Sequence, residues 1–469
     1  MTKSRRVDDL RRANGRRPRA VLCFVQLTES AFLTIINEVS AMSNKLFNNM
    51  NRVSRLFQPI THVPKDTTLK ADNASKSYKL MLHMGIIRQA NTGMYTLMPL
   101  GLRVLQKLIG IVDDEMSKIG AQKLLLPNLT SASLWEKTNR LQDIKTEMFS
   151  VRDRHKNMFI LSPTYEEAIT DLVASLGAVQ MKKLPLLLYQ ISSKWRDEKK
   201  PRLGLLRGRE FIMKDLYSFD SSLDNSRNTY EAVREAYENI FRHIGIEYTI
   251  AVGDTGMMGG SLSHEYHYIS DIGEDTVLSC RSCGFHINST MYESNVCATC
   301  HGAMLQHKAV EVGHTFLLGT RYSEPLNATF SDQGVAKPLM MGCFGLGLTR
   351  LIATAVETLS KDEELRWPKH IAPYTVCIIP PKVQKNCIYE VLDRANIDTI
   401  IDDRVDMTIG RRFIDARKTG YPYVVVIGKS AIESTPLFEI HDQNGETQID
   451  LSMEYLYKII LFYINFKRL

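Results

Sequence analysis

The chain has 469 residues, of which 44% are hydrophobic and 24% are charged, a globular balance that excludes a disordered or collagen-like protein. Its length is too great for one compact core and predicts two or three domains. The formal net charge of +7 would by itself indicate a surface that binds nucleic acid.

The excess positive charge lies at the N-terminus. Residues 1–56 hold eleven Lys or Arg against four Asp or Glu, whereas bases and acids balance over the rest of the chain. An Arg-rich, acid-poor N-terminus is typical of an organelle transit peptide. We therefore expect residues 1–56 to be an organelle transit peptide that starts at Met1 or Met42, with a disordered basic arm as the alternative. No apolar run reaches the ~20 residues of a membrane span, so no membrane partner is predicted.

The first strong secondary-structure signal after this extension is an amphipathic helix over residues 99–119, preceded by a helix and turn over 76–93. The apolar residues that recur every three or four positions, and so predict a buried stripe, are Leu102, Leu105, Leu108, Val112 and Met116. Gly120 is expected to end the helix, and a short apolar strand is predicted from Gln122 to Pro127.

Chemistry-bearing side chains gather in a predicted strand–loop–strand over residues 187–219. Because side chains alternate along a strand, Arg196 and Glu198 are predicted to share one face of the first strand. Arg207 and Phe211 are predicted to share one face of the returning strand. Such a surface suits a nucleotide, since Arg binds phosphate or carboxylate and Phe stacks on a base. A solvated charged hairpin is the alternative.

A glycine-rich strand that runs into a helix is the second candidate nucleotide contact. Gly345 and Gly347 precede Arg350, which falls in the first turn of the predicted helix. The spacing matches neither a dinucleotide-binding fingerprint nor a P-loop. Glycines would let a ligand approach the strand closely, with Arg350 reaching a phosphate. Tight helix–sheet packing is the alternative.

Two CxxC pairs form the candidate metal site. Its four residues are Cys280, Cys283, Cys297 and Cys300. This spacing favours a tetrahedral structural zinc site. Reduced thiols without a metal, or a disulfide, are the alternatives.

Strands and helices alternate in the last hundred residues, which predicts a small, separate α/β domain after Trp367. The predicted elements are a strand at 374–379, a helix at 383–396, a strand at 399–401, a helix at 408–419, a strand at 423–427 and a hairpin that turns at Asn444-Gly445.

Together these segments resemble the three motifs of class II aminoacyl-tRNA synthetases. The helix that leads to Pro127 resembles motif 1, the stretch from Arg196 to Phe211 resembles motif 2, and Gly342 to Arg350 resembles motif 3. Within this class the chain is most similar to prolyl-tRNA synthetases, from about Phe57 to Ile449. The signatures that carry this similarity are residues 163–167, 207–215, 253–266, 311–319 and 402–422.

Two departures from the family pattern bear on this resemblance. Tyr165 stands where the family usually has His, between Thr164 and Glu166, but the middle residue of an extended segment points away from its neighbours. Bacterial relatives carry a large editing insertion between motifs 2 and 3, whereas only 45 residues separate Glu265 from Glu311. The chain therefore resembles the mitochondrial type without that insertion.

The resemblance implies an α+β class II catalytic domain, built on an antiparallel sheet with helices, followed by a small α/β anticodon-binding domain. The expected boundaries are 57–366, with the CxxC insert at 280–300, and 367–469. The implied enzyme is a homodimeric proline–tRNA ligase of the mitochondrial matrix. It would use ATP with Mg²⁺ to convert L-proline to prolyl-adenylate, and would transfer the prolyl group to the 3′ end of tRNA(Pro). A neighbouring specificity such as threonine, or a non-catalytic paralogue acting as a binding or accessory subunit, stays open.

The resemblance also implies a role for each candidate residue. The expected catalytic residues are Arg196, Glu198 and Arg350. The expected ATP-binding residues are Arg196, Glu198, Arg207, Phe211, Gly345, Gly347 and Arg350. Proline would be bound by Thr164, Glu166, Arg196, His264 and Tyr266, with a buried core pair as the alternative for the last two. Contacts to tRNA are expected from Lys199, Lys200 and Arg202 and, unless they form only a solvated face, from Asp402, Arg404 and Arg411. Glu311 is a weak Mg²⁺ candidate.

Overall fold

The computed structural model describes residues 51–61, 75–142, 147–381, 389, 392, 397–432, 437–444 and 447–451. Most of the expected transit peptide and most of the helix predicted at 383–396 lie outside the described residues. Among the described helices none is long and apolar enough to cross a membrane.

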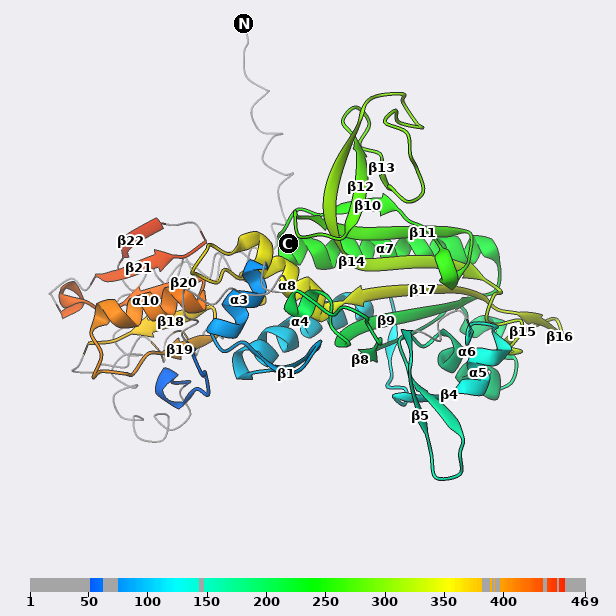
Figure 1. The fold of residues 1–469 in the computed structure, drawn as a ribbon, viewed down its shortest axis with the longest axis horizontal. Helices are drawn as coiled ribbons and strands as arrows, with labels where there is room; N and C mark the ends of the chain where they lie inside the picture. The colour runs from blue at the N-terminus through cyan, green and yellow to red at the C-terminus, as the bar shows by residue number, and fades with distance from the viewer. Residues whose placement is uncertain are drawn as a thin grey trace, which may run out of the picture.

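A nine-stranded, mostly antiparallel sheet forms the body of the molecule (Figure 1). Its strands, in spatial order, are β11 (Leu262–Ile269), β10 (Thr249–Val252), β13 (His286–Asn288), β12 (Asp275–Cys280), β14 (Met304–Gly319), β17 (Met340–Gly347), β9 (Glu210–Asp220), β8 (Leu186–Trp195) and β3 (Gln122–Lys123). Only the pairs β10–β13 and β3–β8 are parallel. The predicted strand–loop–strand is confirmed as β8 and β9, which pair along their whole lengths.

Three helices pack together on one face of this sheet: α4 (Pro99–Lys118), α7 (Leu223–Ile244) and α8 (Leu348–Leu359). The predicted helix at 99–119 is confirmed as α4, and four of its five predicted stripe residues are buried. Leu102 is 44% exposed, so its placement in the stripe was wrong. It lies six residues before Leu108, about 1.7 turns, and therefore faces away from the core.

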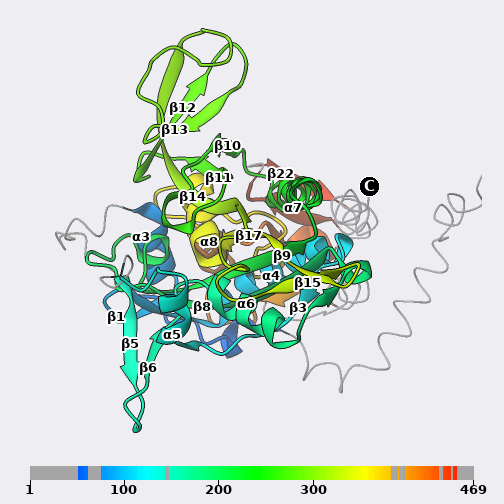
Figure 2. The same ribbon diagram turned by 90° about the vertical axis from the view of Figure 1, so that its right-hand side faces the viewer.

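Short elements complete the catalytic unit around this body. They are α3 (Lys76–His83), β1 (Ile87–Asn91), β2 (Met94–Leu97), β4 (Leu129–Ser131), α5 (Ala132–Lys137), β5 (Phe149–Arg152), β6 (Met158–Leu161), α6 (Glu166–Ser175), β7 (Val179–Gln180), β15 (Thr329–Asp332) and β16 (Val335–Pro338). The turn predicted to end at residue 93 is instead the start of the β1–β2 hairpin. Two hairpins, β5–β6 and β12–β13, project from opposite sides of the body (Figure 2).

A five-stranded sheet forms the C-terminal unit, as the alternation of strands and helices predicted. Its elements are β18 (Val376–Ile379), β19 (Thr399–Ile401), α10 (Ile409–Thr419), β20 (Tyr423–Val426), β21 (Phe438–Asp442) and β22 (Thr447–Leu451), in the sheet order β19-β18-β20-β21-β22. Its inner residues Tyr421 and Val424 join the same buried cluster as Trp367 and the helices of the catalytic unit. The two units therefore share a continuous apolar core.

The segment from Asn51 to Leu56 packs on the C-terminal unit, although the sequence placed it in the extension. The Ser54 hydroxyl donates a hydrogen bond to Asp403 Oδ2 at 2.7 Å, and the Ile401 amide donates one to the Asn51 carbonyl at 2.9 Å. Arg52 forms an ion pair with the same Asp403 carboxylate. The folded part of the chain therefore begins at or before residue 51.

Candidate active site

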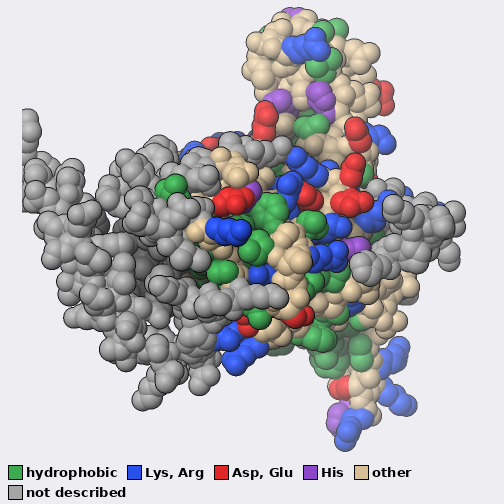
Figure 3. Space-filling view, turned by 90° about the vertical axis from the view of Figure 1, so that its left-hand side faces the viewer, with side chains coloured by type: hydrophobic (Ala, Val, Ile, Leu, Met, Phe, Trp, Pro, Cys, Tyr) green, Lys and Arg blue, Asp and Glu red, His purple; other side chains and the backbone are tan. Residues whose placement is uncertain are grey.

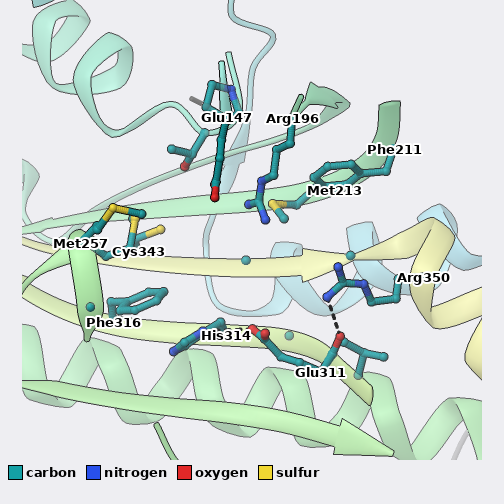
Figure 4. Close-up of a pocket in the computed structure, with 18 of the residues that line it drawn as sticks. Glu147, Arg196, Phe211, Met213, Met257, Glu311, His314, Phe316, Cys343 and Arg350 are labelled. Atoms are coloured by element: carbon teal, nitrogen blue, oxygen red, sulfur yellow. Dashed lines mark hydrogen bonds and ion pairs between the residues drawn. The ribbon is translucent and has the colours of Figure 1, made fainter. Parts of the chain in front are cut away.

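A cavity of about 350 Å³ opens on the sheet face opposite α7. Consecutive residues of β14 point to opposite faces of the sheet. The Thr315 hydroxyl bonds the Tyr230 hydroxyl of α7 at 2.7 Å, whereas His314 and Phe316 line the cavity on the other face (Figure 4). The sheet also contributes Phe211 and Met213 from β9 and Cys343, Gly345 and Gly347 from β17. The cavity floor is thus built from three adjacent strands.

Two arginines enter one end of this cavity. Arg196 follows the last residue of β8, and its guanidinium lies 5.2 Å from the centre of the Phe211 ring. Arg350 lies in the first turn of α8 and donates to the carbonyl oxygens of Leu206 and Glu311, each at 2.9 Å. Burial and the nearby Arg350 charge lower the pKa of Arg196. In the described part of the chain neither guanidinium forms an ion pair, so this end presents two positive charges to an anionic ligand.

The loop between β8 and β9 is longer than the sequence suggested. β8 ends at Trp195 and β9 begins at Glu210, so the prediction that Arg196, Glu198 and Arg207 lie on strand faces was wrong. Leu203 and Gly204 adopt left-handed backbone conformations, which a strand cannot accommodate.

Glu198 lines the cavity, but Arg207 does not. The Arg207 guanidinium pairs with Glu198, with 2.8 Å between Arg207 Nη2 and Glu198 Oε2, and it also pairs with Glu274. Arg207 therefore supports the loop in this conformation rather than facing the cavity.

Gly345 and Gly347 leave the cavity floor open. A Cβ atom at either position would meet its nearest protein atom at 3.7 or 3.6 Å, which is ordinary contact. Packing within the protein therefore does not require glycine at these two positions. Their lack of side chains instead gives a ligand access to the strand.

The opposite end of the cavity is acidic and fully buried. Glu166, the first residue of α6, accepts hydrogen bonds from the Thr164 hydroxyl at 2.6 Å and the Cys343 thiol at 3.0 Å. The Arg140 guanidinium lies 3.4 Å from Glu166 and 3.0 Å from Glu167. One guanidinium thus faces two carboxylates, and all three side chains are at most 2% exposed. Burial raises the pKa of Glu167 despite the nearby Arg140 charge. Glu166 lines the cavity, where its carboxyl oxygens can accept hydrogen bonds from a cationic group of a ligand.

A buried chain of hydrogen bonds holds the segment that carries Thr164. The Tyr165 amide donates to the Tyr217 hydroxyl at 3.0 Å, and this hydroxyl donates to Asp215 Oδ2 at 2.9 Å. Lys194 Nζ lies 2.6 Å from Asp215 Oδ1. Tyr165 is fully buried and does not line the cavity, whereas Thr164 and Glu166 on either side of it do, as the sequence predicted.

Glu311 and His314 form the remaining polar part of the floor. His314 Nδ1 lies 3.0 Å from Glu311 Oε1, and His314 Nε2 lies 2.5 Å from the Ser263 hydroxyl. Burial by itself would raise the pKa of Glu311, but the bond to His314 and the positive charges of His314 and Arg350 lower it to about 2. Glu311 is therefore ionised at neutral pH and can face a cation.

The structure does not bring His264 and Tyr266 to the cavity. Both project from β11 toward α7, where His264 bonds the Tyr230 hydroxyl at 2.8 Å and Tyr266 stacks on Phe241. Strand alternation explains the result, because Ser263 and Glu265 occupy the other face. This is the buried core pair that the sequence left open as the alternative.

Several cavity residues were missed at the sequence level: Arg140, Glu147, Met213, His314, Phe316 and Cys343. The signal for Cys343 was present, because it shares a face with Gly345 and Gly347 at a period of two. His314 belongs to a quoted signature but was given no role. Glu147 lies two residues before β5, and no sequence pattern indicates that it reaches the cavity.

The residues expected to contact tRNA differ in exposure. Lys199, Lys200 and Arg202 are exposed on the loop after β8, and Arg202 Nε lies 2.6 Å from Glu274 Oε1. In the C-terminal unit Asp402 is buried and pairs with Arg404 at 2.6 Å. The carboxylate of Asp402 is thus used within the fold.

Arg404 also forms an ion pair with Asp415 at 3.1 Å. The Arg411 side chain, by contrast, is 56% exposed. Of the three residues expected to contact tRNA in this unit, Arg411 is the most accessible to a partner.

The four cysteines of the CxxC pairs meet at the end of the β12–β13 hairpin. Their sulfur atoms all lie within 4.8 Å of one another, with 3.4 Å between Cys280 and Cys300 and 3.7 Å between Cys283 and Cys297. All four are free thiols. A tetrahedral zinc with Zn–S bonds near 2.3 Å separates its sulfur ligands by about 3.8 Å, so the cluster fits such an ion.

Comparison with known proteins gives two family matches. Residues 149–359 match the tRNA synthetase class II core domain (G, H, P, S and T), and residues 375–462 match an anticodon binding domain. A probable mitochondrial proline–tRNA ligase from Mus musculus is 43% identical over 86% of this chain and 89% of the relative. The corresponding protein from Homo sapiens is 42% identical over 84% of this chain and 87% of the relative.

Solved structures share the fold. A prolyl-tRNA synthetase from Cryptosporidium parvum, complexed with halofuginone and AMPPNP, has a TM-score of 0.69 at 18% identity, over 84% of this chain and 77% of that one. A Giardia lamblia prolyl-tRNA synthetase in complex with prolyl-adenylate has a TM-score of 0.68 at 16% identity, over 81% and 75%.

Proposed function

Because the chain belongs to the proline–tRNA ligase family of class II tRNA synthetases, we propose that this cavity activates proline with ATP and transfers the prolyl group to tRNA. The observation that carries the proposal is one cavity with two arginines at one end, which pair with no carboxylate among the described residues, and an acidic cluster at the other. A carboxylate oxygen of proline attacks the α-phosphorus, and the bond to the β-phosphate breaks to release pyrophosphate. The terminal ribose hydroxyl of tRNA then attacks the prolyl carbonyl, and AMP leaves.

The basic end would hold the nucleotide. Arg196 is placed to bind the α-phosphate and the proline carboxylate together, and Phe211 beside it offers a ring face to adenine. Arg350 would bind the γ-phosphate. Arg207 could assist only after leaving Glu198, which would then be free to bind the adenine edge or a Mg²⁺-bound water. Catalysis here consists of positioning and stabilising phosphoryl charge, because little proton transfer is needed.

The acidic end would hold proline. A secondary ammonium has two N–H donors, and Glu166 with Thr164 offers carboxylate and hydroxyl acceptors beside one another. The Glu166 carboxylate, which contacts Arg140 and faces the cavity, would pair with this cation. Phe316 and Met213 provide apolar walls for the ring, in place of the expected His264 and Tyr266.

Class II synthetases use ATP with Mg²⁺, and Glu311 is the cavity residue best suited to face the metal. Its carboxylate is ionised and lies on the cavity floor. The ion would neutralise triphosphate charge during displacement. His314 contacts the Glu311 carboxylate, so His314 would orient this carboxylate toward the metal.

We further propose that the four-cysteine cluster holds a structural zinc ion. The hairpin that carries it has only a small apolar cluster of its own, so cross-linking by a metal would stabilise it. The variant Cys297→Ser is expected to lower the zinc content from one equivalent per chain to near zero while leaving proline activation within about twofold. Atomic absorption of the purified protein, with Cys377→Ser as a control in a buried cysteine outside the cluster, measures this. Wild-type protein without zinc would contradict the proposal.

The remaining assignments concern assembly and location. Motif 1 and the exposed Leu125 and Leu129 after it support a homodimer, since both large apolar side chains face solvent here. Close relatives are named mitochondrial, and we place this enzyme in the matrix. We set the boundary of a cleaved leader before Asn51 rather than after residue 56, because the intervening residues bind the C-terminal unit. A catalytic unit up to residue 366 and an anticodon-binding unit from 367 complete the proposed organisation.

The test of the whole proposal is aminoacylation of a tRNA(Pro) transcript with labelled proline. A protein starting at residue 51 should charge this transcript and should not charge a tRNA(Thr) transcript with threonine. A non-catalytic paralogue would charge neither. Arg196 and Arg350, which such a paralogue would be expected to lose, are both present and point into the cavity (Figure 4).

A further inference from the structure

The β5–β6 hairpin projects into solvent beside the cavity and has no role in the proposed chemistry. We propose that its tip, residues 152–157, binds the phosphate backbone of the tRNA acceptor stem. This inference rests on the proposed function, because it takes the 3′ end of tRNA to occupy the cavity.

The tip presents positive charge that the protein does not neutralise. Arg152, Arg154 and Lys156 are exposed, and in the described part of the chain none of them forms an ion pair. Figure 3 shows the Lys and Arg side chains gathered at the end of this projection. Residues 57–469 as a whole, with this tip included, contain equal numbers of basic and acidic side chains, so a polyanion must be held by local patches such as this one.

The single acid of the tip is occupied within the turn. Asp153 accepts hydrogen bonds from the His155 amide at 2.8 Å, and from the amide and side chain of Asn157, each at 2.9 Å. These bonds lower the pKa of Asp153, with the Asn157 side chain as the largest cause. The carboxylate shapes the turn and leaves the three cations directed outward.

The hairpin is continuous with the cavity wall at both ends. Glu147, two residues before β5, lines the cavity, and so do Pro163 and Thr164 just after β6. Five residues separate Glu147 from Arg152, which corresponds to about 17 Å at the rise of an extended chain. The tip therefore lies within reach of the nucleic acid that follows a 3′ end seated in the cavity.

The hairpin also borders the other exposed basic segment of this face. The Asp197 amide donates to the Glu147 carbonyl at 2.8 Å, which fixes the loop carrying Lys199 and Lys200 against the base of the hairpin. Two basic segments thus leave the cavity mouth from neighbouring points. Duplex RNA matches this arrangement, since its phosphates form a dense row of negative charge and offer contacts over the whole length.

A different explanation is that the charges protect an edge strand. β5 lies at the edge of the three-stranded sheet β4-β6-β5, and charged side chains on edges prevent sheet-to-sheet aggregation. That role concerns solubility and makes no demand on tRNA affinity, so the two explanations differ in a measurable quantity.

The experiment compares the triple variant Arg152→Ala/Arg154→Ala/Lys156→Ala with wild type in binding a labelled tRNA(Pro) transcript and a minihelix of its acceptor stem. We expect the dissociation constants of both RNAs to rise about tenfold near 0.15 M salt, and the slope of log affinity against log salt to fall by roughly two. A charge-preserving Arg152→Lys/Arg154→Lys variant should bind like wild type.

The matched control is Lys182→Ala/Lys183→Ala/Lys337→Ala, which removes three exposed charges around β7 and β16. Unchanged affinity and salt slope in the hairpin variant, or a loss seen with the full transcript but absent with the minihelix, would overturn the inference. Proline-dependent exchange of pyrophosphate into ATP needs no RNA and should be the same in all variants. If the wild-type protein showed no such exchange, the proposed function would be contradicted. The RNA-binding measurement does not depend on exchange and tests the hairpin alone.

Discussion

The two ends of the cavity solve opposite electrostatic problems. At the basic end, Arg196 and Arg350 are held by a ring contact and by backbone carbonyls, and no described carboxylate pairs with them. At the acidic end, Glu166 already accepts hydrogen bonds from Thr164 and Cys343 and is partly neutralised by Arg140. The two arginines of the basic end are available to an anionic ligand, whereas the carboxyl groups of the acidic end already bond within the protein.

The comparison teaches how one small cavity can bind a zwitterion and a polyanion together. In the proposed function, the acidic end would fix the substrate ammonium, so that the carboxylate would point toward the arginines. The arginines would then neutralise a charge that grows in the transition state, which is where stabilisation accelerates the reaction.

Removing an arginine at the basic end should have the largest effect. We expect Arg350→Ala to lower kcat/KM for proline-dependent ATP–pyrophosphate exchange by about 100- to 1,000-fold, because a preorganised donor to phosphoryl charge is lost. The matched control is Arg281→Ala, on the exposed end of the β12–β13 hairpin, which should exchange like wild type. Normal exchange by the Arg350→Ala enzyme would contradict the role of the basic end in stabilising phosphoryl charge.

Neutralising the acidic end should have a smaller and more selective effect. Glu166→Gln keeps the contact between Arg140 and Glu167, and glutamine has nearly the same shape as glutamate, so we expect the fold to be retained. We expect KM for proline to rise about 30- to 100-fold, since a charged hydrogen bond worth roughly 2–3 kcal/mol is lost. KM for ATP should change less than twofold, and an equal rise in both constants would contradict the division of the cavity.

Loosening the support of the acidic end should have the smallest effect. Tyr217→Phe removes the hydroxyl between the Tyr165 amide and Asp215 but keeps the ring. We expect KM for proline to rise about fivefold, the cost of one net hydrogen bond, with kcat little changed. Tyr189→Phe is the matched control, because its hydroxyl bonds Asp113 of α4 on the opposite side of the sheet. Equal effects of the two variants would show a general loss of stability.

The sequence allowed much of this site to be predicted, for identifiable reasons. Phe211 and Arg350 were recognised because one lies on a strand and the other at the start of a helix. Arg196 was recognised as well, although it lies just after β8 rather than on a strand face. Thr164 and Glu166 were recognised from resemblance, and the structure shows the hydrogen bond between them.

Other residues could not be predicted in the same way. Arg140 reaches Glu167 from a turn 27 positions earlier, and nothing local indicates that contact. The placement of His264 and Tyr266 in the proline pocket could not be checked from sequence, because the register of a strand decides which face each residue occupies. The register of β11 is set by its pairing with β14.

The exposed hairpins were the least predictable in function. The spacing of the four cysteines predicts their cluster. For the basic tip of β5–β6 the sequence shows only three cations, whereas the structure shows that the nearby Asp153 bonds to His155 and Asn157 within the turn. The net charge of the chain could not reveal this basic tip either, because a net charge counts charged residues without regard to which of them are paired.

The central claim is that the acidic end selects the secondary ammonium of proline while the basic end activates its carboxylate. Amino-acid-dependent ATP–pyrophosphate exchange by the protein starting at residue 51, compared among proline, threonine and alanine, tests it most directly. The account predicts exchange with proline at a kcat/KM at least about 100-fold above that for the other two, since discrimination of 2–3 kcal/mol corresponds to that ratio. No exchange with proline, or equal exchange with all three, would contradict it.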